Sequence, residues 1–132
     1  MPYVSPAEAP NLPAIDLQAV RQAMGPPPWR KPLVGTPATR WVLSEWPAGF
    51  VAPAHWHPRA DEVFHVLAGR AIFQFADDQA EYAAAPGTVL LAPRGLAHSI
   101  RVPGPDSLVL LVSVSPNEDA PDETVDAGQA ST

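Results

Sequence analysis

The chain is expected to fold as a single all-β domain, either a sandwich or a barrel. Its 132 residues are close to the commonest domain length, and 46% of them are hydrophobic, which suits one compact core. From about residue 39 onward, short apolar or alternating runs are separated by glycine, proline and aspartate, a pattern typical of strands joined by turns. The sequence contains neither a repeat of about 20–50 residues nor a regular alternation of strands with helices, which argues against solenoids and dinucleotide-binding folds.

Residues 1–38 are predicted to form an N-terminal arm outside the core. Twelve of the 18 prolines lie in the first 58 residues, and the three at 26–28 favour an extended segment that is poor in hydrogen bonds. One short helix is expected from Asp16 to Met24. Asp16 can cap this helix, apolar side chains recur along one of its faces, and the glycine that follows Met24 ends it.

The barrel is predicted to cover residues 39–114. Seven stretches of strand length follow one another in this region, and turn residues bound each of them. The predicted strands lie within residues 39–46, 50–57, 62–69, 70–75, 88–93, 98–102 and 107–114.

Residues 115–132 are predicted to be a solvated, disordered tail. This segment carries five acidic residues and no basic one, and it has too little apolar surface to offset the entropy lost on ordering. The rest of the chain has nine acidic and eight basic residues, so most of the net charge of −6 belongs to the tail. The net charge therefore says little about a substrate.

The composition excludes several kinds of site and partner. Cysteine is absent, which excludes disulfides, thiolate zinc sites, iron–sulfur clusters and a cysteine nucleophile. Eight basic residues against fourteen acidic ones provide no positive stripe for a phosphate backbone, so no nucleic acid is expected as a partner. No run of eighteen apolar residues and no secretory leader is recognisable, so we expect no membrane association and a cytoplasmic location.

The four histidines provide the candidate chemistry, and all of them lie between residues 55 and 98. Alternate residues of a strand face the same side, so His55 and His57 form a chelating pair. A hairpin could place the Glu62 carboxylate beside them, and His98 could add a third imidazole from a more distant strand. Such a donor set suits a divalent ion of iron, manganese, nickel, cobalt, copper or zinc better than calcium or magnesium. The sequence does not encode which of these ions is bound.

The spacing of these residues resembles that of the cupin superfamily, in particular its small single-domain members with a type-2 cupin barrel. The first cupin motif is matched by Gly49-x5-His55-x-His57-x4-Glu62-x6-Gly69, and the second, except for its last position, by Gly87-x5-Pro93-x-Gly95-x2-His98. The family's asparagine at that last position is Val102 here. The resemblance covers about residues 39–114. It implies a double-stranded β-helix, or jelly-roll, barrel that holds one divalent transition metal on His55, His57, Glu62 and His98.

Strand alternation predicts which side chains surround this site. His65 has the opposite parity to Glu62, so it is expected to face away from the metal. Arg40, Arg94 and Arg101 could bind an anionic substrate near the mouth of the barrel, but we expect them to be solvated surface charges. The predicted lining of the pocket is apolar and consists of Phe64, Val66, Phe73, Phe75 and Trp41.

Three functions fit these observations. Four protein ligands leave one or two positions open on an ion that accepts five or six. The leading hypothesis is therefore a metal-dependent enzyme, an oxygenase that acts on an apolar or aromatic hydroxylated or dicarbonyl compound, with Glu62 as a catalytic proton shuttle. Quercetinase-like dioxygenases belong to the cupin family, whereas its thiol dioxygenases typically lack the glutamate. The alternatives are a sugar or sugar-acid isomerase or lyase and a ligand-binding barrel without catalysis. The family also implies a homodimer, in which residues 26–38 could be exchanged.

Overall fold

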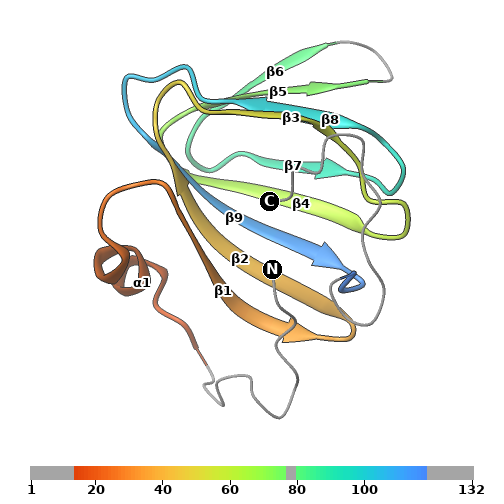
Figure 1. The fold of residues 1–132 in the computed structure, drawn as a ribbon, viewed down its shortest axis with the longest axis horizontal. Helices are drawn as coiled ribbons and strands as arrows, with labels where there is room; N and C mark the ends of the chain where they lie inside the picture. Colours follow the sequence, from red (N-terminus) through yellow and green to blue (C-terminus); the bar gives the residue numbers. More distant parts are fainter. Residues whose placement is uncertain (1–13, 77–79, 119–132) are drawn as a thin grey trace.

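The computed structural model describes residues 14–76 and 80–118, which form two antiparallel sheets packed face to face (Figure 1). The five-stranded sheet has the order β1-β2-β9-β4-β7, with β1 Trp29–Thr36, β2 Thr39–Trp46, β9 Leu108–Ser115, β4 Asp61–Ala68 and β7 Val89–Ala92. The four-stranded sheet has the order β3-β8-β5-β6, with β3 Val51–His55, β8 His98–Arg101, β5 Ala71–Phe75 and β6 Glu81–Ala84. From β2 onward the chain passes repeatedly between the two sheets, and the predicted all-β barrel is confirmed.

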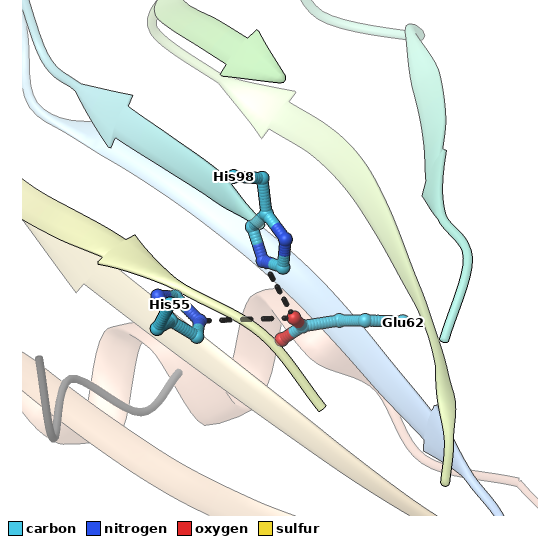
Figure 2. A group of neighbouring side chains, drawn as sticks. All are labelled: His55, Glu62 and His98. Atoms are coloured by element: carbon cyan, nitrogen blue, oxygen red, sulfur yellow. Dashed lines mark hydrogen bonds and ion pairs between the residues drawn. The ribbon is translucent and has the colours of Figure 1, made fainter. Parts of the chain in front are cut away.

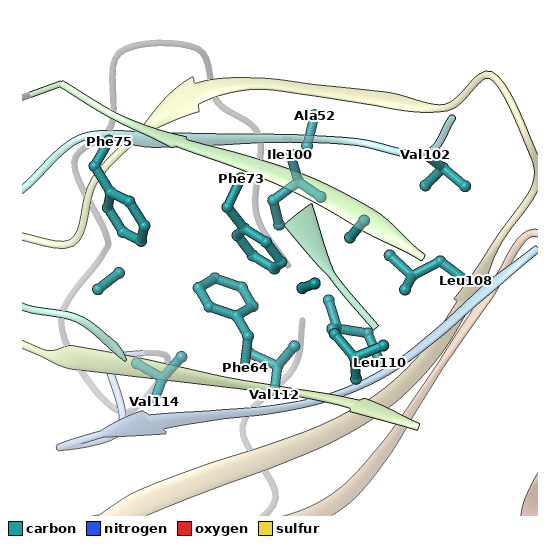
Figure 3. Close-up of a cluster of buried hydrophobic side chains, with 14 of the residues drawn as sticks. Ala52, Phe64, Phe73, Phe75, Ile100, Val102, Leu108, Leu110, Val112 and Val114 are labelled. Atoms are coloured by element: carbon teal, nitrogen blue, oxygen red, sulfur yellow. The ribbon is translucent and has the colours of Figure 1, made fainter. Parts of the chain in front are cut away.

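The space between the sheets is filled by alternate side chains of the strands (Figure 3). Phe64 of β4 and Phe73 of β5 are both fully buried, and their ring centroids lie 5.0 Å apart across the interior. Leu108, Leu110 and the next alternate residues of β9 complete the same layer. Burying such side chains contributes about 1.5–3 kcal/mol each. The result is a rigid core that borders the candidate site.

Helix α1, Leu17–Met24, is confirmed together with its predicted cap, because the Asp16 carboxylate accepts hydrogen bonds from the backbone N–H groups of the second and third helical residues. The helix packs on the outer face of the five-stranded sheet, where Val20 and Met24 join a second apolar cluster around Trp29 and Leu43. Within the described ranges, no helix is long and apolar enough to cross a bilayer.

The structure differs from the sequence prediction at residues 29–36, which lie within the expected arm but form β1. The strand pairs with β2 from Trp29 opposite Glu45 to Thr36 opposite Thr39, and Trp29 is buried. Pro32 is tolerated because β1 is an edge strand, where one missing N–H does not interrupt a ladder on both sides. The sheet therefore begins before residue 39.

The structure describes the predicted tail, residues 115–132, only as far as Glu118. Ser115 ends β9, and the backbone N–H of Asn117 donates a hydrogen bond to the carbonyl of Pro37 at 3.2 Å. Asn117 and Glu118 are both buried. These first tail residues therefore pack on the barrel instead of lying in solvent, while residues 119–132, like the first thirteen residues of the arm, lie outside the described residues.

Candidate metal centre

The barrel brings together the four residues that the sequence predicts as ligands. His55 is the last residue of β3 and pairs with His98, the first residue of β8, while Glu62 enters from β4 in the opposite sheet (Figure 2). His57 lies in the loop that follows β3. Its backbone carbonyl accepts a hydrogen bond from the N–H of Gly95 at 2.8 Å. All four side chains are buried.

The histidine Nε2 atoms converge on one oxygen of the carboxylate. Oε1 of Glu62 lies 2.9 Å from Nε2 of His98, 3.2 Å from that of His57 and 3.9 Å from that of His55. Ligand atoms of His55, Glu62 and His98 all lie within 4.8 Å of one another, so this cluster could hold a metal ion.

The other ring nitrogen of each histidine faces an acceptor. Nδ1 of His55 lies 3.2 Å from the carbonyl oxygen of Pro53, and Nδ1 of His98 lies 3.2 Å from that of Leu96. Nδ1 of His57 lies 2.9 Å from Oε1 of Glu118. Because a carbonyl oxygen or carboxylate only accepts, each Nδ1 carries the proton. The Nε2 atoms of the three rings therefore face Glu62, and they are the ring atoms that a metal could bind.

The charges of the site keep its carboxylate ionised. Burial alone would raise the pKa of Glu62, but the close contacts with His57 and His98 and the charge interactions with these two rings outweigh it and hold that pKa far below its usual range. Burial lowers the pKa of His57, but Glu62 and Glu118 outweigh it and raise that pKa. For His55, burial and the nearby His98 lower the pKa. The site thus combines a carboxylate anion with imidazoles of unequal basicity.

These residues fit a transition metal. The Nε2 atoms of His55 and His57 are buried and make no hydrogen bond in the structure, although each lies near the carboxylate. Buried ring nitrogens are normally satisfied by a hydrogen bond or by a metal. Imidazole nitrogens with one carboxylate oxygen are the donors preferred by divalent iron, manganese, cobalt, nickel, copper and zinc.

A model of the cupin domain matches residues 42–114, more than half of the chain. The chain belongs to the cupin family. Germin-like protein subfamily 3 member 2 of Arabidopsis thaliana is 33% identical over 70 residues, which cover 51% of this cupin and 31% of that protein. The chain thus matches about a third of the length of this curated relative.

Several solved structures have a fold similar to that of this cupin. KdgF from Halomonas sp. shares 29% identity at a TM-score of 0.61, over 68% of this chain and 81% of that chain. A putative sugar phosphate isomerase from Acidithiobacillus ferrooxidans shares 26% identity at a TM-score of 0.55, over 61% and 52% of the two chains. BH2720 from Bacillus halodurans has a TM-score of 0.70 over 90% and 91%, and at 18% identity its likeness is one of fold.

The predicted lining residues of the cupin barrel divide into two groups. Phe64, Phe73, Phe75 and Val66 are buried between the sheets, and the rings of Phe64 and Phe75 lie with their centroids 5.4 Å and 6.2 Å from that of His98. The prediction for Trp41 is wrong, because this side chain is on the outer face of β2 and is 39% exposed. The residues next to Trp41 in β2 face the interior of the barrel instead, because side chains alternate between the two faces of a strand.

His65 and three arginines are further side chains whose surroundings the sequence predicts. His65 is part-exposed and lies on the opposite face of β4 from Glu62, as predicted. Arg94 and Arg101 are exposed and pair with acidic side chains. The prediction for Arg40 is wrong: it is only 2% exposed, and its position lies in one cross-strand row with Val114 and Glu62. A guanidinium group is thus buried inside this end of the cupin barrel.

An open pocket of about 330 Å³ lies beside the candidate metal centre. Phe75 and Tyr82 form one side of it, and Leu90 and Leu96 form part of the other. Because Phe75 also contacts the His98 ring, its side chain lies between the pocket and the ligands. Phe75 therefore separates the pocket from the candidate metal centre.

Sequence reasoning missed Glu118. Glu118 is 4% exposed and its carboxylate contacts His57, whereas the acidic composition of residues 115–132 predicts a solvated tail. The only signal available was its position, four residues after the end of the last predicted strand, 107–114. No cupin motif marks this residue.

Proposed function

We propose that this cupin is a metal-dependent enzyme that oxygenates a small apolar or aromatic compound carrying hydroxyl or dicarbonyl oxygens. The observation that supports the proposal most is the convergence of three buried imidazole Nε2 atoms on the Glu62 carboxylate, beside the rings of Phe64 and Phe75. A divalent transition metal held by His55, His57, Glu62 and His98 would supply Lewis-acid and redox chemistry to oxygen atoms of the substrate.

The side chains around the site favour a substrate with an apolar body. The neighbouring pocket is lined by Phe75, Tyr82, Leu90 and Leu96, which would exclude water from a bound ring or hydrocarbon segment. Phe75 and Tyr82 are in edge-to-face contact, with ring centroids 5.6 Å apart. Their faces suit an aromatic substrate, since aromatic pairs contribute about 0.5–1.5 kcal/mol beyond the area that they bury.

Glu62 is proposed to move the substrate proton as well as to bind the metal. Its carboxylate is ionised at neutral pH because His57 and His98 hold its pKa low. Oε1 would accept a proton from a substrate hydroxyl, or from a C–H group beside a carbonyl, that a bound metal has made more acidic, and it would return the proton later. The neighbouring imidazoles stabilise the Glu62 anion before the first transfer and after the second.

We expect metal-loaded protein to consume dioxygen with at least one substrate of this class, and His57→Ala to abolish the uptake. The test loads the chain separately with each of the six candidate ions and measures oxygen uptake with catechols, hydroxyflavones and 1,3-diketones. His65→Ala is the matched control, because this histidine lies on the far face of β4 and its loss should leave the rate unchanged. Absence of uptake with every ion and substrate would overturn the oxygenase proposal.

A sugar-acid isomerase or lyase is the second candidate. It is favoured by the buried Arg40, whose guanidinium suits a substrate carboxylate, and by the likeness to the putative sugar phosphate isomerase. Such an enzyme would convert sugar acids or sugar phosphates under strictly anaerobic conditions at an unchanged rate, which proton NMR can follow. Tight binding of a compound without any conversion would favour a non-catalytic binding barrel instead.

A homodimer is part of this proposal. Trp41, Val89 and Leu91 are exposed apolar side chains on the outer face of the five-stranded sheet, and paired sheet faces are one way in which small cupins associate. Light scattering of the full chain should give twice the mass of one chain, and the mass of a single chain would contradict the expectation.

A further inference from the structure

We propose that Glu118 is a positioning residue for the metal centre, so that the segment after β9 completes the site. The role rests on the proposed metal centre. The segment is fixed in place by the hydrogen bond from the Asn117 N–H to the carbonyl of Pro37, in the turn between β1 and β2. This contact directs Glu118 back toward the loop that follows β3, where its side chain is buried.

Both oxygens of the Glu118 carboxylate contact this loop. Oε1 accepts from Nδ1 of His57 at 2.9 Å, and Oε2 accepts from the backbone N–H of Arg59 at 2.9 Å. The carboxylate therefore holds the imidazole ring and the backbone two residues later at the same time. This arrangement fixes the rotation of the ring and keeps a proton on Nδ1, so that Nε2, which faces Glu62, is the atom available to a metal.

His57 differs in this respect from the other two histidines. The Nδ1 atoms of His55 and His98 face neutral carbonyls that lie only two residues earlier in the chain, so their local backbone orients them. The partner of His57 is an anion 61 residues away in the sequence. A charged acceptor makes the ring a stronger donor toward a metal, and loss of such a partner typically costs about 10–100-fold in metal affinity. The orientation of the His57 ring thus depends on the segment that follows β9.

The test measures Co²⁺ binding to the full chain against a competing chelator, together with the visible absorption of the bound ion. Glu118→Ala should raise the Kd for Co²⁺ by about 10–100-fold and change the absorption bands. Glu118→Gln keeps the volume but removes the charge, so it should give a smaller loss and remains usable if the alanine variant does not fold. Glu81→Gln, which removes an exposed carboxylate paired with Arg101, is the control and should match the wild type.

The outcomes separate this role from a purely structural one. If Glu118 only anchors the segment, both variants will melt at a lower temperature without metal but will bind Co²⁺ with wild-type affinity and spectrum, and the proposal is overturned. Failure of the wild-type chain itself to bind Co²⁺ would overturn the metal centre, and this role with it. A weaker and spectrally altered complex in the Glu118 variants alone supports the proposal.

Discussion

Glu62→Gln is expected to abolish turnover and to lower the affinity for a divalent transition metal by more than about a hundredfold. A residue that only orients a metal ligand typically contributes about 10–100-fold to metal affinity. Glu62 should contribute more, because it supplies the oxygen on which all three Nε2 atoms converge. An amide carries no charge to attract the ion and cannot accept the substrate proton. Metal content after dialysis and a Co²⁺ titration measure the first effect, and the rate with the best substrate measures the second.

The neighbouring residue provides a matched control for this prediction. Asp61 also carries a carboxylate on β4, but its side chain is 43% exposed and accepts hydrogen bonds from Arg94. Asp61→Asn should therefore keep the metal and the activity. Circular dichroism of both variants shows whether the barrel is intact. Full metal retention by a folded Glu62→Gln protein would remove Glu62 from the ligand set.

Gly69→Ala is expected to destabilise the barrel by about 2–5 kcal/mol, because a strained backbone and a steric clash add together. Gly69 has a φ of +75°, in the left-handed region that L residues rarely adopt. An added Cβ would also collide with the backbone carbonyl of Ser107, just before β9. Backbone atoms cannot move aside as the end of a flexible side chain can. Urea denaturation of the variant and the wild type measures the difference in the free energy of unfolding.

Gly49→Ala separates the two contributions. Gly49 also has a positive φ, +88°, but an added Cβ there meets no atom within 4 Å. Its replacement should cost only the backbone strain, about 1–2 kcal/mol. Equal destabilisation by the two substitutions would show that the approach of Ser107 to Gly69 contributes nothing.

The ligand cluster could be predicted from the sequence because its residues match the spacing of the two cupin motifs, although β3 shifts register between Ala52 and His55 and His57 lies beyond the end of that strand. His55 and Glu62 lie at the ends of well-formed strands, and His98 follows a turn that Gly95 makes. Trp41 and Arg40 could not be assigned in the same way. Both faces of β2 are buried over much of the strand and carry apolar as well as polar residues, since one face packs in the barrel and the other lies partly under α1, so alternation does not distinguish inside from outside.

The missed strands have physical reasons of their own. β1 is interrupted by a proline and follows three others, so its composition resembles that of an extended arm. β6 contains a glutamate and two alanines, which are depleted in strands, and it forms only because Ala71 to Gln74 of β5 pair with it. Glu118 was missed because its partner lies 61 residues away, a contact that no local pattern encodes.

The position of β9 in its sheet affects the order in which the molecule can be made. β9 is the last described strand, yet it lies at the centre of the five-stranded sheet, between β2 and β4. During synthesis, the β1–β2 hairpin and the β4 strand therefore have no partner between them until residues 108–115 leave the ribosome. At about 5–20 residues per second, several seconds pass in which Glu62 is already made but its neighbouring strand is absent. A metal site that depends on the closed barrel can thus form only after β9 has been made.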